Sequence, residues 1–152
     1  VLCIFEIQNN KNMYEIIQKA HSGWAYLVLL ILLIATVNAW IGKSSKKEFT
    51  AKDRRISLFG LIATHLQLVF GLVLYFVSPF GMASLGQMSD KALRLTSLEH
   101  PLINIIAITL ITIGWSKHKR AADSPAKFNA IAVFYGIGLL AILSRIPWSL
   151  WF

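Results

Sequence analysis

The four histidines are the first candidates in this chain for side chains that bind a metal or carry protons. His21 and His100 each stand at the start of a long apolar run, His65 lies inside another, and His118 lies in the basic segment SKHKR. Imidazole is a common iron ligand, and its second ring nitrogen usually donates to a carbonyl or carboxylate. The single cysteine, Cys3, excludes an internal disulfide and a Cys-rich metal site, and no CxxCH motif for covalent heme is present.

Four apolar segments must position these histidines. They span about residues 21–42, 56–78, 98–116 and 128–150, in a chain that is 56% hydrophobic with a mean hydropathy of +0.60. About 20 mostly apolar residues suffice for a helix to cross a bilayer, where the helix satisfies its own backbone hydrogen bonds. The sequence therefore predicts an all-α integral membrane protein in which residues 1–152 form one domain.

Lysine and arginine residues predict how the chain is oriented. The net charge is +8, and most of the positive charge lies in the loops 43–55 and 117–127. Basic loops stay on the cytoplasmic side, so both termini are expected on the non-cytoplasmic side of an up-down four-helix bundle. Because the positions of the basic loops follow from topology, the expected partner of this basic chain is the lipid bilayer, and no nucleic acid is expected.

The alternating directions of the spans bring two histidines to the same depth. The first and third spans run the same way, so His21 and His100 are expected near the outer face on diagonal helices. Two imidazoles in this position suit axial ligation on both sides of a porphyrin. His65 is expected near the middle of the bilayer, where a hydrogen bond, a proton path and contact with a cofactor edge all remain open. His118 is expected to be solvated, and a purely interfacial or structural role for all four histidines also remains open.

Polar and small residues on the second segment recur on one helical face. Such a face lets a flat ring or another helix approach closely, and simple helix packing is the alternative for the glycines. Gly71 is expected about 10 Å from the outer end of its helix, beside such a ring. The face consists of Gly60, Thr64, Gln67, Gly71, Tyr75 and Ser78.

Two further polar residues lie near the expected outer face. Asn104 follows His100 by one helical turn, and Arg145 is the only full charge in the last apolar run. The Arg145 guanidinium could pair with a carboxylate held among the helices. It could also extend to the lipid headgroups, and both interpretations remain open.

Several of these stretches resemble a family of small bacterial membrane proteins called cytochrome B. The similar stretches are HSGWAYLVLL, ATHLQLVFGLVLYFVSP, LEHPLINIIAITLITIGWSKHKR and IPW, within residues 14–148. More remotely, the layout resembles one half of heme A synthase, in which histidines of the first and third helices hold heme. The pattern QLVFG, from Gln67 to Gly71, is similar to a Gln-and-Gly pattern on the second helix of that family.

The resemblance implies that His21 and His100 are the axial ligands of heme b in a protein of the bacterial inner (cytoplasmic) membrane. The chain departs from heme A synthase in having one such unit, and its first histidine stands in QKAHSGW instead of a glutamate-and-arginine motif. The catalytic activity of that family is therefore not expected here. The residues expected to contact the cofactor are His21, His100, Gly71, Gln67, Asn104, Arg145 and His65.

The leading functional hypothesis is a b-type heme protein that transfers electrons within the membrane. A quinone, a partner redox subunit or a second copy in a homodimer would exchange electrons with it, so an electron carrier is expected more than a stand-alone enzyme. The alternative is a non-redox accessory or assembly subunit of a membrane complex. A small transporter with His65 as its proton carrier is a third hypothesis, although the chain lacks the inverted repeat common in transporters.

Overall fold

The computed structural model describes residues 2–150, with side chains from 12 to 149; the side chain of Cys3 lies outside this range. Within these residues the chain is all-α, as the sequence predicts. Short helical segments, including a π-helical turn, lie between α2 and α4 and after α5. The long helices are α1 (Leu2–Ser44), α2 (Ala51–Val77), α4 (His100–Arg120) and α5 (Ser124–Ser144), and the short segments are η1 (Met82–Ser84), α3 (Lys91–Arg94), η2 (Leu95–Glu99) and η3 (Trp148–Leu150).

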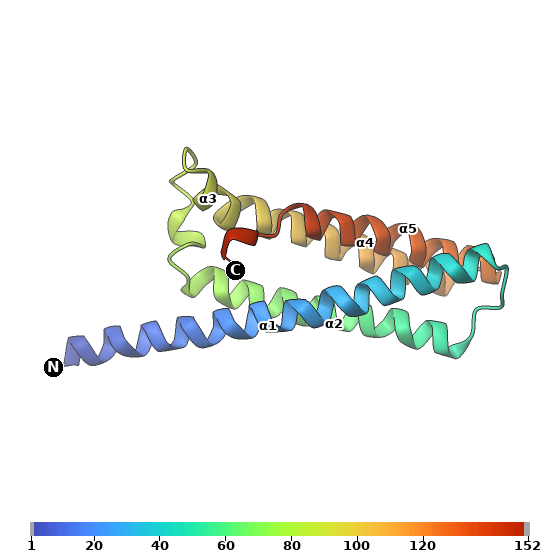
Figure 1. Cartoon of the computed structure of the whole chain (residues 1–152), viewed down its shortest axis with the longest axis horizontal. Coiled ribbons are helices and arrows are strands. Elements are labelled where there is room, and N and C mark those ends of the chain that lie inside the picture. Colours follow the sequence, from blue (N-terminus) through green and yellow to red (C-terminus); the bar gives the residue numbers. More distant parts are fainter. Residues whose placement is uncertain (1, 151–152) are drawn as a thin grey trace.

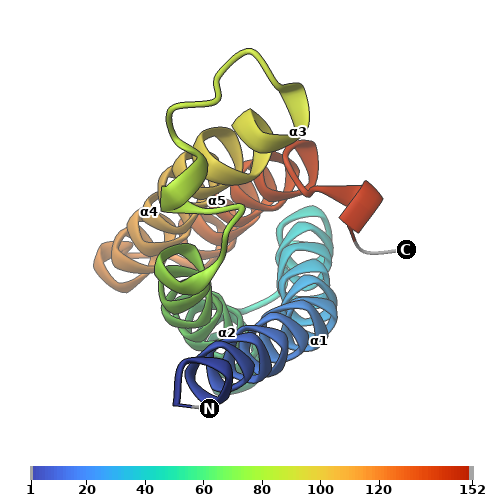
Figure 2. The same cartoon turned by 90° about the vertical axis from the view of Figure 1, so that its left-hand side faces the viewer.

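The four long helices form a bundle in which sequence neighbours run antiparallel (Figure 1). α1 packs on α2 and α5, and α4 packs on α5 and α2, so α1 and α4 are diagonal to each other (Figure 2). The connections 45–50 and 121–123 lie at one end, and the α2–α4 connection and the end of α5 lie at the other. Four helical stretches are each long and apolar enough to cross a membrane, as in a multi-pass membrane protein. They are Asn12–Ser44, Ala51–Val77, Lys91–Arg120 and Ser124–Ser144.

The most tightly packed part of the core lies toward the end that carries connections 45–50 and 121–123. Leu32, Ile111, Phe128, Ile131 and Tyr135 are fully buried there. The Tyr135 hydroxyl donates to the carbonyl of Ser57 on α2 at 2.9 Å, so the one polar atom of this large side chain is satisfied. Close packing at this end fixes the helices relative to one another, and the cavity described below opens at the other end.

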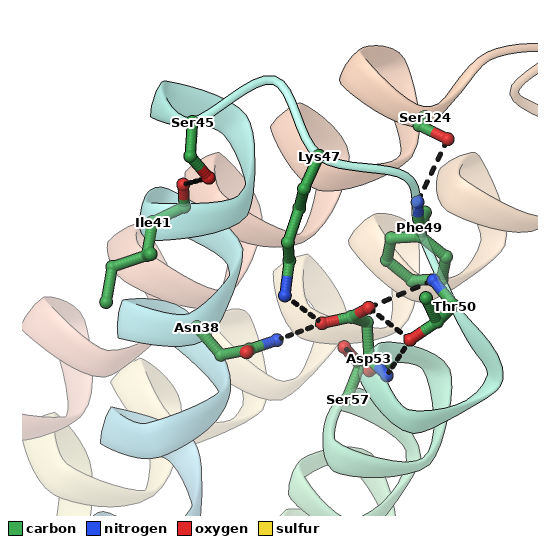
Figure 3. Close-up of polar contacts among 9 residues, drawn as sticks. All are labelled: Asn38, Ile41, Ser45, Lys47, Phe49, Thr50, Asp53, Ser57 and Ser124. Atoms are coloured by element: carbon green, nitrogen blue, oxygen red, sulfur yellow. Dashed lines mark hydrogen bonds and ion pairs between the residues drawn. The ribbon is translucent and has the colours of Figure 1, made fainter.

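A buried carboxylate joins α1 to the start of α2 (Figure 3). Asp53 is 2% exposed, and its Oδ2 accepts from the Thr50 backbone N–H at 2.9 Å and from the Thr50 hydroxyl at 2.6 Å. Its Oδ1 accepts from the Asn38 side chain on α1 and from Lys47 in the connection, both at 2.9 Å. Thr50 and Asp53 form a capping box, which satisfies backbone groups that the first turn of a helix leaves free. The connection is thereby fixed to both helices.

The expectation that His118 is solvated is wrong. α4 continues to Arg120, and the His118 side chain is 2% exposed, between Phe49 and Trp115, with ring centroids 5.5 Å and 4.3 Å away. The backbone N–H of Phe49 donates to the Ser124 hydroxyl at 3.0 Å, which holds the connection over this ring. His118 is therefore a packing residue of this end of the bundle.

The segment LEHPLIN lies inside a helix that runs from Lys91 to Arg120, not at a junction between loop and helix. The turn Leu95–Glu99 is π-helical and is followed by His100 and Pro101, and Pro101 occupies one of the first positions of α4. Proline has no N–H for the carbonyl four residues earlier, and its ring collides with that carbonyl in a regular helix. A turn that is one residue wider accommodates both effects, so the helix passes Pro101 without ending.

α5 ends earlier than the expected boundary near residue 150. Its last residue is Ser144, and Pro147 follows three residues later. A residue that precedes proline is disfavoured in the helical region, so Ile146 cannot easily extend α5. Residues 145–147 instead turn back toward the bundle, and Ile146 and Pro147 line the cavity that holds both histidines.

Candidate functional site

A cavity of about 370 Å³ lies in the bundle at the end opposite connections 45–50 and 121–123. Its walls are formed by residues of α1, α2, η2 and α4, together with the end of α5 and the segment that follows it. Apolar side chains predominate, among them Val28, Leu68, Ile105 and Ile108. Small-molecule sites are usually concave and mostly apolar with a few convergent polar groups, in the range of roughly 300–1,000 Å³. The cavity therefore has the character of a ligand site.

His21 on α1 and His100 on α4 face each other within this cavity. Their ring centroids are 6.2 Å apart, and the ring planes are nearly perpendicular, at 82°. Two imidazoles bound on opposite sides of one metal through bonds of about 2 Å would place their centroids roughly 6 Å apart. The spacing is therefore compatible with shared ligation of a metal. The two residues are 79 positions apart in the chain and meet because α1 and α4 are diagonal.

A hydrogen bond fixes which nitrogen of His100 is free for a metal. Nδ1 lies 2.8 Å from the backbone carbonyl oxygen of Arg145. Because a carbonyl can only accept, Nδ1 carries the proton, and the lone pair is on Nε2. Asn104 donates to the His100 carbonyl at 2.7 Å, and its amide nitrogen is 3.2 Å from Nδ1. The Arg145 carbonyl thus orients the His100 ring, as a backbone carbonyl often does for a metal-binding histidine, and Asn104 fixes the backbone beside it.

α2 holds His21 through Gln67 and Gly71. The Gln67 amide nitrogen donates to the His21 carbonyl at 3.0 Å and lies 3.2 Å and 3.4 Å from Nδ1 and Nε2 of the ring. A Cβ atom at Gly71 would stand 3.2 Å from Cε1 of His21, so glycine makes room for the imidazole. Gln67 Oε1 is buried and has no hydrogen-bond partner among the described residues. The Gln67 amide nitrogen therefore contacts both the backbone carbonyl and the ring of His21.

The polar face predicted on the second segment divides into two parts. Gly60 packs against the core, where an added Cβ would stand 3.3 Å from Tyr135. Helix packing therefore accounts for this glycine. The residues nearer the other end of α2 face the cavity, and they are Thr64, Gln67, Gly71, Tyr75 and Ser78.

Arg145 reaches the site through its backbone. Its side chain is 47% exposed and is not part of the cavity wall, and its Nε lies 3.3 Å from Oε2 of Glu99. Oε1 of Glu99 accepts from Nε of Arg94 at 2.8 Å. One carboxylate therefore joins two guanidinium groups beside His100, and the carbonyl of Arg145 orients the His100 ring.

His65 does not join the other histidines. It is exposed on the surface of α2, where Nδ1 donates to the Leu61 carbonyl at 2.8 Å and Nε2 is 3.4 Å from the Thr112 hydroxyl. It is absent from the wall of the cavity. The structure thus gathers His21, His100, Gln67, Gly71 and Asn104 at one site, with Arg145 at its edge and His65 outside it.

Ser97 is a cavity residue that the sequence analysis did not single out. It is 1% exposed, and its hydroxyl is buried with no hydrogen-bond partner among the described residues. Its position three residues before His100 is the signal that could have indicated it, because residues three apart share a helical face. Ser97 lies in the π-helical turn Leu95–Glu99, just before Pro101.

The two histidines suit a metal whose other ligands are supplied by a cofactor. Among the side chains that the structure describes, no three His, Cys, Asp or Glu residues are grouped so that they could hold a bare ion. Two facing imidazoles in an apolar cavity instead suit a flat macrocycle that supplies the other ligands. Comparison of the chain with protein-family models, with curated proteins and with solved structures gives no match in any of the three.

Proposed function

We propose that this chain is a b-type heme protein that transfers electrons within the bacterial inner membrane. The observation that carries the proposal is the 6.2 Å separation of the His21 and His100 rings inside an apolar cavity. The resemblance to the bacterial cytochrome B family supports the same cofactor and the same membrane. Heme, when bound, supplies one-electron exchange between the ferric and ferrous states of its iron.

The chain's own residues have separate tasks in this proposal. His21 and His100 would bind the metal, and the Arg145 carbonyl and the Gln67 side chain keep their rings oriented. Val28, the leucines and the isoleucines of the cavity exclude water from the metal. A low-dielectric environment disfavours the more highly charged ferric state, so these walls raise the midpoint potential.

Electron exchange requires a partner, and we propose a quinone or a partner redox subunit at the end of the bundle that holds the cavity. A second copy of the chain, in a homodimer, could serve the same purpose. All the partners that we propose lie in or beside the bilayer, and nucleic acid is not among them. The role proposed is that of an electron carrier or a subunit of a redox complex, in preference to that of a stand-alone enzyme.

An absorption spectrum tests the proposal directly. Protein purified from membranes in mild detergent is expected to show a Soret band, reduced α and β bands of a low-spin b-type heme, and heme extractable into alkaline pyridine. Protein that folds but contains no heme, and takes up none when it is added, would contradict the proposal. The accessory or assembly role would then be the remaining hypothesis.

The orientation in the membrane is a second testable part of the proposal. Connections 45–50 and 121–123 share one end of the bundle with most of the lysines and arginines, so that end is expected in the cytoplasm. A reporter fused after residue 152 should be active if it functions only outside the cytoplasm. The same fusion with a reporter that functions only inside should be silent, and the reverse pattern would overturn this orientation.

The Arg145 side chain gives a prediction about the midpoint potential. If its guanidinium offsets a carboxylate of the bound heme, Arg145→Gln leaves that negative charge uncompensated, which stabilises ferric heme. The midpoint is then expected to fall by a few tens of millivolts, since about 59 mV corresponds to a tenfold change for one electron. The Arg145 carbonyl remains, so heme occupancy should not change. A midpoint equal to that of the parent protein, at full occupancy, would restrict Arg145 to its backbone contact and its ion pair with Glu99.

A further inference from the structure

The hydroxyl of Ser97 differs from its neighbours in having no partner. Ser97 lines the cavity at 1% exposure, and its Oγ makes no hydrogen bond within the described residues. A buried hydroxyl without a partner costs free energy, because it has given up its hydrogen bonds to water. A bound molecule that supplies the missing hydrogen-bond partner removes this free-energy cost.

Neighbouring helical hydroxyls show the usual solution. Thr96 also lines the cavity, but its hydroxyl bonds to the carbonyls of Ala92 and Leu93, at 3.2 Å and 3.1 Å. Thr64 bonds likewise to Gly60, at 3.0 Å. A serine or threonine inside a helix normally uses the carbonyl of the preceding turn in this way. Ser97 does not, although it lies in the same continuous helical stretch.

The π-helical turn before Pro101 accounts for where Ser97 lies. The widened turn Leu95–Glu99 begins the helix that carries His100, and Ser97 and His100 both line the cavity. π-helical turns inside α-helices are often found at functional sites. Ser97 precedes His100 by three residues, and beside His100 Glu99 joins the guanidinium groups of Arg94 and Arg145, a cluster here called the rim of the cavity.

The charge at this rim favours an anion. Arg94 and Arg145 both contact Glu99, so two positive charges meet one negative charge, and one positive charge remains in excess. The cavity beside them is mostly apolar, which strengthens the attraction for a carboxylate that approaches from inside. A hydroxyl that donates to a carboxylate makes one of the stronger hydrogen bonds in proteins.

We infer that Ser97 is a cofactor-binding residue whose hydroxyl donates a hydrogen bond to a propionate carboxylate of the bound heme. The inference rests on the proposed function and adds how the ring is held: His21 and His100 fix the metal, and Ser97 fixes the rotation of the macrocycle between them. The carboxylate lies toward the rim, on the side of Arg94 and Arg145.

The test compares two hemes that differ only at the propionates. Apoprotein in detergent micelles is titrated with ferric heme and, separately, with the dimethyl ester of ferric heme, which has no carboxylate. Ser97→Ala is expected to weaken binding of heme about tenfold or more, the usual effect of losing a hydrogen bond to a charged group. Binding of the ester should change less than about threefold. Thr109→Val, which removes a hydroxyl of α4 that lies outside the cavity, is the matched control and should bind both hemes like the parent protein.

Thermal unfolding of the apoprotein supplies a readout that does not involve heme. The Ser97 hydroxyl has no partner to lose there, so the Tm of Ser97→Ala apoprotein is expected to equal or exceed that of the parent. Ser97→Thr keeps a hydroxyl and should retain the parent's preference for heme over the ester. Unchanged heme affinity in Ser97→Ala, or an equal loss for heme and ester, would overturn the inference while leaving the proposed function in place. A parent protein that binds neither heme would overturn the proposed function, and this inference with it.

Discussion

Replacement of His21 or His100 by alanine is expected to remove the low-spin heme spectrum. Each variant deletes one of the two imidazoles whose rings stand 6.2 Å apart in the cavity. Removal of residues that only orient a metal ligand already costs about 10–100-fold in affinity, so loss of the ligand itself should exceed that range. The measurement is heme content per protein after purification, together with the absorption spectrum of the reduced state.

Two controls separate ligation from general damage. His65→Ala removes an imidazole of α2 that faces away from the cavity, so heme content should match that of the parent protein. The His100→Ala variant leaves space beside the Arg145 carbonyl, and free imidazole added to this variant should restore part of the low-spin spectrum. If His65→Ala lost its heme while His100→Ala kept it, the assignment of the axial ligands would be wrong.

Asp53→Ala is expected to destabilise the fold by about 2–4 kcal/mol, whether or not heme is bound. The buried carboxylate accepts hydrogen bonds from Asn38, Thr50 and Lys47, and its loss leaves the Asn38 amide and the Thr50 N–H without these partners. Lys47 is half exposed and can return to water, so most of the effect should come from the other donors and from the lost helix cap. The measurement is unfolding of the apoprotein in detergent micelles by heat or denaturant.

Glu48→Ala is the matched control for Asp53→Ala. Glu48 is an acidic residue of the same connection, but its side chain is exposed, so its removal should change stability by less than about 0.5 kcal/mol. The loss of stability in Asp53→Asn should lie between those of Glu48→Ala and Asp53→Ala, because the amide oxygen still accepts from Thr50 while the charge is lost. Equal stability of Asp53→Ala and Glu48→Ala would contradict a structural role for the buried carboxylate.

The sequence by itself determined the spans and which helices carry the two facing histidines. Apolar runs of about 20 residues separated by short polar loops predict four antiparallel helices, because the bilayer fixes their length. The alternating direction of the helices then places His21 and His100 at one end, on helices that turn out to be diagonal. The 3.6-residue period of α2 likewise predicted that Gln67 and Gly71 share a face, and this face lines the cavity.

Only the tertiary structure decided how these side chains meet. Hydropathy is a property of single segments, and the rotation of a helix about its axis depends on the helices that pack against it. The approach of the His21 and His100 rings, the exposure of His65 and the burial of His118 all follow from that rotation. The carbonyl of Arg145 became a partner of His100 because α5 ends early, before Pro147. The unpartnered hydroxyl of Ser97 depends on a π-helical turn, which arises where a proline must be accommodated within a helix that tertiary packing continues.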